Sequence, residues 1–317
     1  NRIGLGLGAI TASSTSADLT QVTLWQGATQ IGSATFVGTN RNATSTLSSP
    51  LLLTKDTDVA ITVKGDLATQ GTSQASNPGA LLTVDVDVNT NTQGTGVQSG
   101  STVNATGSTA VSGVRVFKSY PTVAQQTSGM SSTLIAQAGI DLYRFSIAAN
   151  AAGELALNKV VVNIATSSAS TANGTTSVTN LKVYAYTDSL FSNAVSGFTS
   201  GQIVATIVGL ANGDNSAVLS SLLTIPAGQT YYFKVVGDVA QVAGTTGSAG
   251  TVTTRISGDA TYPSLSTLLG VYATGLGNFV WSPVSTTTAA TASLDWTNGF
   301  NVSGLPSGGT NSFTLSK

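Results

Sequence analysis

The sequence contains no cysteine and no histidine. The absence of cysteine excludes disulfides, thiol nucleophiles and thiolate metal ligands, and with them the secreted domains that disulfides hold together. The absence of histidine removes the usual general base, the Ser-His-Asp arrangement and most zinc sites. An enzyme would need paired carboxylates, and the local candidate is Asp85 with Asp87, which more simply form a solvated strand face. We therefore predict no enzyme, no catalytic residue, no metal site and no cofactor.

Charged residues are also scarce, at 8% of the chain, where about 25% is typical of soluble domains. The 12 lysines and arginines are scattered and the net charge is −1, so no basic cluster indicates nucleic acid or an anionic membrane as a partner. No apolar run approaches the roughly 20 residues of a membrane-spanning helix. A surface with so few charges suits a protein covered by neighbouring subunits or by glycans.

The chain is instead rich in Ser, Thr, Gly, Ala and Val, and it contains one stretch twice. Residues 47–68, LSSPLLLTKDTDVAITVKGDLA, align without a gap on residues 219–240, LSSLLTIPAGQTYYFKVVGDVA. Val59, Ile61 and Val63 alternate in the first copy as Tyr231, Phe233 and Val235 do in the second, a period typical of a half-buried strand. A unit used twice predicts two homologous β domains.

The pattern predicts an all-β fold of two tandem Ig-like β-sandwich domains with a C-terminal strand extension. We place the first domain at 1–121, the second at 122–284 and the extension at 285–317. The segment Asn89–Ser112, rich in Gly, Ser, Thr and Asn, is expected to be a long loop. The two domains differ in one respect. The strand pattern of 141–148 precedes the second repeat, and the first repeat has nothing in that place.

The C-terminal residues resemble what the first repeat lacks, because Phe313 and Leu315 alternate like a strand. We expect the segment Asn311–Lys317 of one subunit to complete the first domain of the next, which would build a filament. The predicted donor residues are Ser312, Phe313, Thr314, Leu315, Ser316 and Lys317, and the predicted acceptor residues are Ile3, Leu5 and Leu7. The alternatives are a frayed tail and an excerpt cut from a longer repeat array. The start at Asn1, inside a strand pattern and without a signal peptide, indicates a processed or excised chain.

Other residues have both a functional and a structural interpretation. N-glycosylation sequons begin at Asn42, Asn104, Asn173 and Asn301, and the first three fall in predicted loops. In a chain this rich in Asn, Ser and Thr, several sequons are expected by chance. Trp25, Trp281 and Trp296 could stack on sugars, but tryptophans spread across a β protein are more often anchors of its core or interfaces.

Several segments of the second repeat also resemble a known group of proteins. VRVFKSYPTVA, LYRFSIAANAAGELALNKV, IPAGQTYYFKVVGDV, NFVWSP and DWTNGF are similar to repeat-bearing surface proteins of candidate-phyla-radiation (patescibacterial) bacteria. The resemblance runs from about Val114 to Leu305. It implies an extracellular protein with Ig-like domains, in a surface layer or an appendage, and it supplies no catalytic residues.

These observations predict an extracellular structural subunit that associates with itself, head to tail, into a cell-surface filament. The first alternative is a lattice protein of a surface layer, which would form sheets through lateral contacts. The second is an adhesin or carbohydrate-binding module, which would be a monomer with saturable binding.

Overall fold

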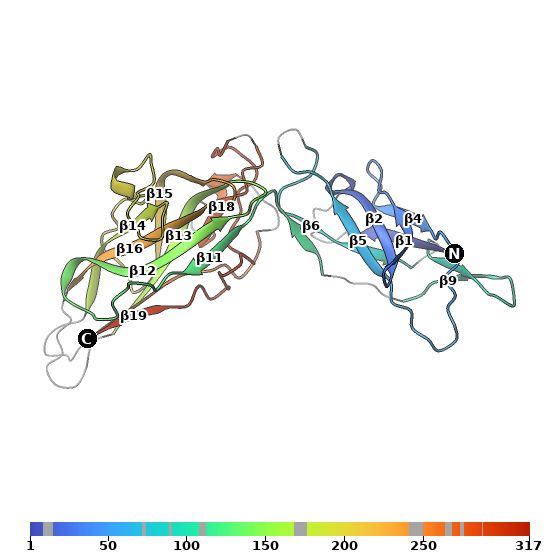
Figure 1. The fold of residues 1–317 in the computed structure, drawn as a ribbon, viewed down its shortest axis with the longest axis horizontal. Helices are drawn as coiled ribbons and strands as arrows, with labels where there is room; N and C mark the ends of the chain where they lie inside the picture. The colour runs from blue at the N-terminus through green and yellow to red at the C-terminus, as the bar shows by residue number, and fades with distance from the viewer. Residues whose placement is uncertain are drawn as a thin grey trace. The chain divides into compact units, whose positions relative to one another are not determined.

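The computed structural model describes residues 1–8, 15–71, 74–88, 91–107, 112–167, 176–240, 250–263, 268–272, 276–286 and 288–317. The described residues form β-strands and three 3-10 turns, η1 Ser16–Asp18, η2 Thr199–Gly201 and η3 Leu269–Tyr272. They divide into unit 1, Asn1–Phe117, and unit 2, Lys118–Lys317. The predicted all-β class with tandem sandwich-like units is confirmed (Figure 1).

Unit 1 contains the strands β1 to β10. Their bounds are β1 Arg2–Leu7, β2 Leu19–Gln26, β3 Thr29–Ala34, β4 Asn42–Thr46, β5 Thr62–Leu67, β6 Ala80–Leu82, β7 Val84–Asp87, β8 Gln93–Thr95, β9 Thr102–Asn104 and β10 Val114–Val116. One sheet has the order β4-β1-β8-β9, with β7 also paired to β1, and a second has the order β3-β2-β5. β6 and β10 form a separate pair. The core combines Leu5 and Leu7 of β1 with Val22 and Leu24 of β2, so the two larger sheets pack on each other.

Unit 2 contains the strands β11 to β19. Their bounds are β11 Pro121–Gln125, β12 Gln137–Ala149, β13 Leu155–Ser167, β14 Ser177–Tyr186, β15 Gly213–Ile225, β16 Thr230–Ala240, β17 Thr251–Ile256, β18 Phe279–Ser282 and β19 Phe313–Ser316. One sheet has the order β11-β12-β16-β14 and the other β15-β13-β17-β19, with β18 on β13. Phe145 of β12 stacks on Phe233 of β16 at 4.8 Å between ring centroids, and both are fully buried.

The two units repeat the same strand pairings in the same register. In unit 1, Leu24 of β2 lies opposite Val63 of β5, and in unit 2, Val183 of β14 lies opposite Val235 of β16. The pair β1–β4 likewise corresponds to β13–β15, and β1–β7 corresponds to β13–β17. The internal repeat seen in the sequence is therefore a structural repeat, and a position in one unit can be compared directly with its counterpart in the other.

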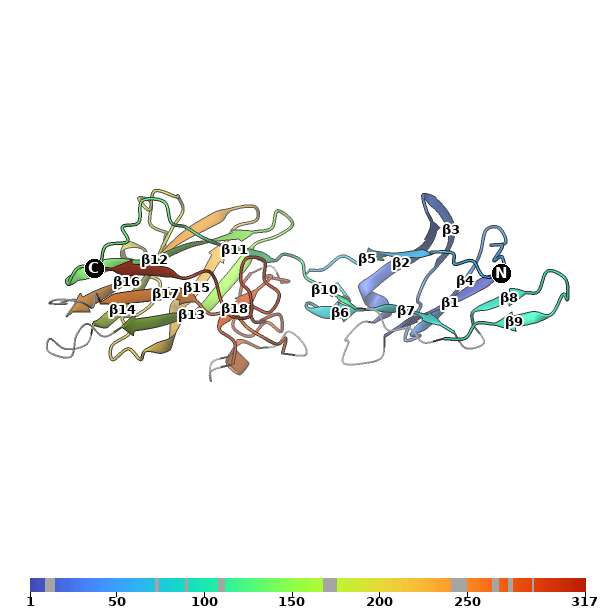
Figure 2. The ribbon, with the colours of Figure 1, turned by 90° about the horizontal axis from the view of Figure 1, so that it is seen from below.

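Two predictions of segment layout differ from the structure. The boundary falls after Phe117, and residues 285–317 are part of unit 2, because Trp296 and Leu315 are buried in it at 0% and 1% exposure. The long loop predicted for 89–112 contains the hairpin β8–β9 (Figure 2). Its strands carry polar residues without apolar alternation, so the hydrophobic pattern contains no strand signal there. The hairpin pairs with β1 through Arg2 and Gln93.

Candidate functional site

The edge strand β5 of unit 1 is the first feature of the candidate site. Among the described residues β5 pairs only with β2, whereas its counterpart β16 lies between β14 and β12. Every residue of β5 is exposed, while alternate residues of β16 are buried. Val63 is 36% exposed and its counterpart Val235 is 0% exposed. Unit 1 therefore presents, as an open edge, the strand that unit 2 covers.

An apolar groove of about 550 Å³ lies beside this edge. Its lining includes Val59, Ile61 and Val63, Ile3 with Leu51, and residues of the β8–β9 hairpin. The groove continues along two leucines, Leu52 and Leu53, which are 66% and 65% exposed. We call these lining residues, together with the free edge of β5, the acceptor groove.

Unit 2 shows how the residues equivalent to Leu51–Leu53 are covered there. The counterpart of Leu51–Leu53 is Leu223–Ile225 at the end of β15, which pairs with Leu155–Leu157 at the start of β13. Leu223 and Ile225 are consequently buried, at 4% and 0% exposure. β1 begins at Arg2, the counterpart of Lys159, so no strand of the described part of unit 1 pairs with Leu51–Leu53, although residues of β8 and β9 line the same groove. The groove thus follows two strand positions that unit 2 fills.

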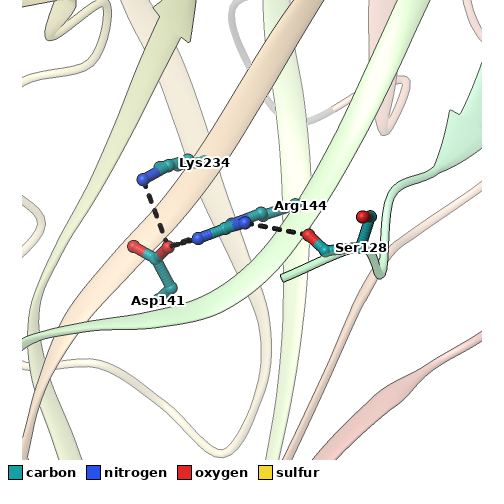
Figure 3. Close-up of polar contacts among 4 residues, drawn as sticks. All are labelled: Ser128, Asp141, Arg144 and Lys234. Atoms are coloured by element: carbon teal, nitrogen blue, oxygen red, sulfur yellow. Dashed lines mark hydrogen bonds and ion pairs between the residues drawn. The ribbon is translucent and has the colours of Figure 1, made fainter. Parts of the chain in front are cut away.

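A cluster of charged side chains links β12 to β16 in unit 2 (Figure 3). The carboxylate of Asp141 pairs with Arg144 on β12 and lies 3.3 Å from Nζ of Lys234 on β16. Arg144 also donates a hydrogen bond to the Ser128 carbonyl at 3.1 Å, and its guanidinium lies 4.7 Å from the ring centroid of Phe191. Both cations are engaged by the single carboxylate of Asp141, so we interpret the cluster as a structural link between β12 and β16.

The predicted donor residues are already paired within their own unit. β19 forms an antiparallel ladder with β17, in which Leu315 lies opposite Val252 and Phe313 opposite Thr254. Leu315 is buried and Phe313 half-buried, while Ser312, Thr314, Ser316 and Lys317 are exposed. The backbone of Ser316 also bonds to Ser132 and Leu134. To act as a donor, this strand would first have to leave unit 2.

The predicted acceptor residues need correction. Leu5 and Leu7 are buried core residues, and Leu5 is paired with Ala43 on one side and Val86 on the other, so β1 offers no free edge there. Of the predicted acceptors, only Ile3 lines the acceptor groove. The alignment of 47–68 with 219–240 relates β5 to β16, whose outer edge is covered by β12 in unit 2.

Tyr143 on β12 anchors the C-terminal strand and gives a first testable prediction. Its buried hydroxyl hydrogen-bonds with the Thr310 hydroxyl at 2.7 Å and the Asn311 carbonyl at 2.8 Å. Tyr143→Phe should lower the stability of unit 2 by about 1 kcal/mol, the typical net value of such a bond. Hydrogen exchange should rise first in β19. Unchanged exchange in β19 would show that the hydroxyl does not hold the strand.

The same tyrosine predicts a dependence on alkaline pH. Burial raises the pKa of Tyr143 to about 12, although its hydrogen bond with Thr310 opposes the shift. The unfolded chain ionises at a pKa of about 10. The hydroxyl therefore stabilises the fold fully below about pH 10, and this contribution is lost as the pH rises to about 12. Tyr143→Phe should show a smaller loss over that interval.

The remaining sequence candidates do not form a second site. Asn42 and Asn104 are exposed but lie on β4 and β9, so the expectation of loops was wrong for both. Asn301 is exposed in a turn with φ of +58°, and Asn173 lies outside the described residues. Asp87 accepts a hydrogen bond from Asn91 at 2.6 Å. In the part of the chain that the structure describes, no group of three or more His, Cys, Asp or Glu side chains could hold a metal ion.

Comparisons with known proteins add little to this geometry. No protein-family model matches the chain, and no curated protein matches it. Among solved structures, the collagen adhesin (CNA) from S. aureus aligns at 13% identity over 80% of this chain and 74% of that chain, with a TM-score of 0.15. A similarity of this size supports no inference about function. Within the described ranges, no helix has the length and apolar character needed to cross a membrane.

Proposed function

We propose that this chain is an extracellular structural subunit that polymerises head to tail into a cell-surface filament, with unit 1 of each subunit completed by a β-strand of the next. The observation that carries the proposal is the acceptor groove, an open edge beside apolar side chains where unit 2 has β12. Such edges recruit strands from other chains. A contact between two different surfaces of one chain extends into a fibre when its rotation does not close a ring.

In this proposal the protein works by assembly and not by catalysis. The scarcity of charge, at 8% of residues, fits a surface largely covered by neighbouring subunits. The exposed Asn42, Asn104 and Asn301 could carry glycans on the part of the surface that neighbouring subunits leave uncovered. An extracellular location follows from the same proposal, because surface polymers of this kind are assembled outside the cell.

The C-terminal segment Asn311–Lys317 is the donor that we propose. In the free subunit β19 occupies the edge of its own unit, where it protects β17 from unwanted pairing. In the polymer it would leave β17 and pair beside Leu51–Leu53 of the next subunit, with Leu315 filling the place that Leu155 has in unit 2. Domain swapping, in which copies of a protein exchange an identical element, is a low-cost route to association. The exchange of β19 between subunits would be of this kind.

A reversible lock on β19 tests the donor. Thr253 and Thr314 are directly opposed on β17 and β19, with 2.9 Å between their hydroxyl oxygens, and the chain has no other cysteine to interfere. The variant Thr253→Cys/Thr314→Cys should form a disulfide that closes a long loop. When oxidised it should not polymerise, and reduction should restore filaments seen by electron microscopy.

The single variant Thr314→Cys is the matched control and should polymerise in both redox states. Normal filaments from the oxidised double variant would show that β19 is not the donor. Sheets in place of filaments would indicate a surface-layer lattice. A wild-type protein that stays monomeric under all conditions of assembly would overturn the proposed function itself.

A further inference from the structure

The unit 2 sheet shows what kind of strand fits an edge of this type. β12 pairs with β16 in antiparallel register, with Tyr143 opposite Val235, Phe145 opposite Phe233 and Ile147 opposite Tyr231. The side chains of Tyr143, Phe145 and Ile147 are buried, at 0%, 0% and 1% exposure. Three large apolar side chains at alternate positions thus complete the core on this side of unit 2.

The residues that would face such a strand are present in unit 1. The counterparts of Val235, Phe233 and Tyr231 are Val63, Ile61 and Val59, and all three line the acceptor groove. We infer that the β5 edge binds an extended polypeptide segment of the β12 type, antiparallel, with three large apolar side chains in register with Val63, Ile61 and Val59. This inference rests on the proposed function and concerns the β5 edge, the second of the two open strand positions, which is distinct from the position beside Leu51–Leu53 that the C-terminal donor would take.

The exposed carboxylate of Asp66 gives independent support for the same register. Its counterpart Asp238 accepts a hydrogen bond from the backbone N–H of Gly139 on β12, at 2.9 Å. In unit 1 the carboxylate of Asp66 is exposed, and Asp66 is the last residue but one of β5, beside the open edge. An incoming strand in the register of β12 would bring a backbone N–H to this carboxylate.

The charge on β5 does not block the edge. Lysines on exposed edge strands commonly prevent pairing with other chains. Lys64, however, alternates with Val63 and so points to the opposite face of the sheet. Its Nζ lies 4.1 Å from the ring centroid of Trp25. The ammonium group therefore makes a cation–π contact on that opposite face. The face of β5 that carries Val63, which lines the groove, otherwise holds only the uncharged Gly65 and Leu67.

Two other occupants fit the β5 edge itself less well. A second β5 edge would present Val63, Gly65 and Leu67, and the central glycine has no side chain to enter the groove. The C-terminal segment presents only Phe313 and Leu315 at alternate positions. The length of β12, from Gln137 to Ala149, also exceeds that of β19, from Phe313 to Ser316. A longer strand with three large apolar side chains matches the lining residues best.

A peptide of the chain's own sequence is the appropriate probe. The fluorescent peptide of residues 137–149, QAGIDLYRFSIAA, should bind the full chain and raise its anisotropy. Replacing Tyr143, Phe145 and Ile147 by serine in the peptide should weaken binding at least tenfold, as should Val63→Asp in the protein. Methylation of the peptide's backbone nitrogens at the alternate positions that face β5 should weaken binding equally. It removes the backbone hydrogen bonds to β5 and keeps every side chain.

The location of binding decides the outcome. Hydrogen exchange should fall in residues 59–67 on addition of the peptide. Protection confined to unit 2, absence of binding, equal binding to Val63→Asp, or tighter binding of a 311–317 peptide would each overturn the inference. If filaments form but saturating peptide does not shorten them, the inference fails and the proposed function stands. If the peptide binds but the protein never polymerises, the inference stands and the proposed function fails.

Discussion

Val63→Asp should abolish filament formation while changing the stability of the subunit by less than about 1 kcal/mol, as expected of an exposed position. The same substitution at the repeat-related Val235 should have the opposite outcome. Val235 is 0% exposed between β12 and β14. An unpaired carboxylate buried there should cost more than about 4 kcal/mol and unfold unit 2.

The contrast follows from one difference between the units. Val63 and Val235 have equivalent partners on the inner side, Leu24 and Val183, but only Val235 has a strand on its outer side. A carboxylate at position 63 remains hydrated in the free subunit and loses its water only when a strand arrives. The free-energy cost of removing water from the new carboxylate therefore opposes assembly when the aspartate is at position 63, and opposes folding when it is at position 235.

The measurements are chemical denaturation for stability and electron microscopy for assembly. Val63→Thr, which keeps the shape of the side chain and adds a single hydroxyl, is the matched control and should retain filaments with reduced yield. Normal filaments from Val63→Asp would show that strands do not add at β5. Strong destabilisation by Val63→Asp would show that this valine is already covered in the free subunit.

The sequence predicted those features of the fold that depend on local pattern. The gapless alignment of 47–68 with 219–240 predicted two related units, and the alternation at Val59, Ile61 and Val63 identified the side chains that line one face. In unit 2 the pattern of 141–148 is part of β12, which pairs with β16, the counterpart of β5. A two-residue period reports which side chains share a face, and equivalent stretches keep their register because they bury equivalent side chains.

The sequence could not identify which strands pair, since periodicity carries no information about the neighbour. The alternation at Phe313 and Leu315 was recognised, but pairing with β17 depends on contacts with residues far away in the chain, including Tyr143. The assignment of Leu5 and Leu7 as acceptors did not anticipate that β4 and β7 pair with both edges of most of β1, whereas Ile3 lines the acceptor groove. The hairpin β8–β9 was missed because polar strands lack the pattern.

Residues 285–317 illustrate how a segment with little periodicity can still be part of a core. Trp296 is 0% exposed and packs with Tyr272, Val280 and Val284. Its Nε1 donates a hydrogen bond to the Ala290 carbonyl at 3.0 Å. Because the ring is enclosed and its polar atom is satisfied, this segment closes one end of unit 2 rather than extending from it.

Trp296→Ala should consequently destabilise unit 2 by about 3–5 kcal/mol, the usual cost of removing a large buried aromatic side chain. Leu294→Ala, two residues away at 66% exposure, is the matched control and should change the stability by less than about 0.5 kcal/mol. Chemical denaturation gives both values, and hydrogen exchange assigns the loss to unit 2. If Trp296→Ala were as mild as the control, residues 285–317 would be a separate extension, as the sequence alone suggested. If the loss is large, truncations that remove the whole segment unfold unit 2 and cannot test the donor strand. The reversible lock between Thr253 and Thr314, which keeps Trp296 and Leu315 in place, is for that reason the informative test of assembly.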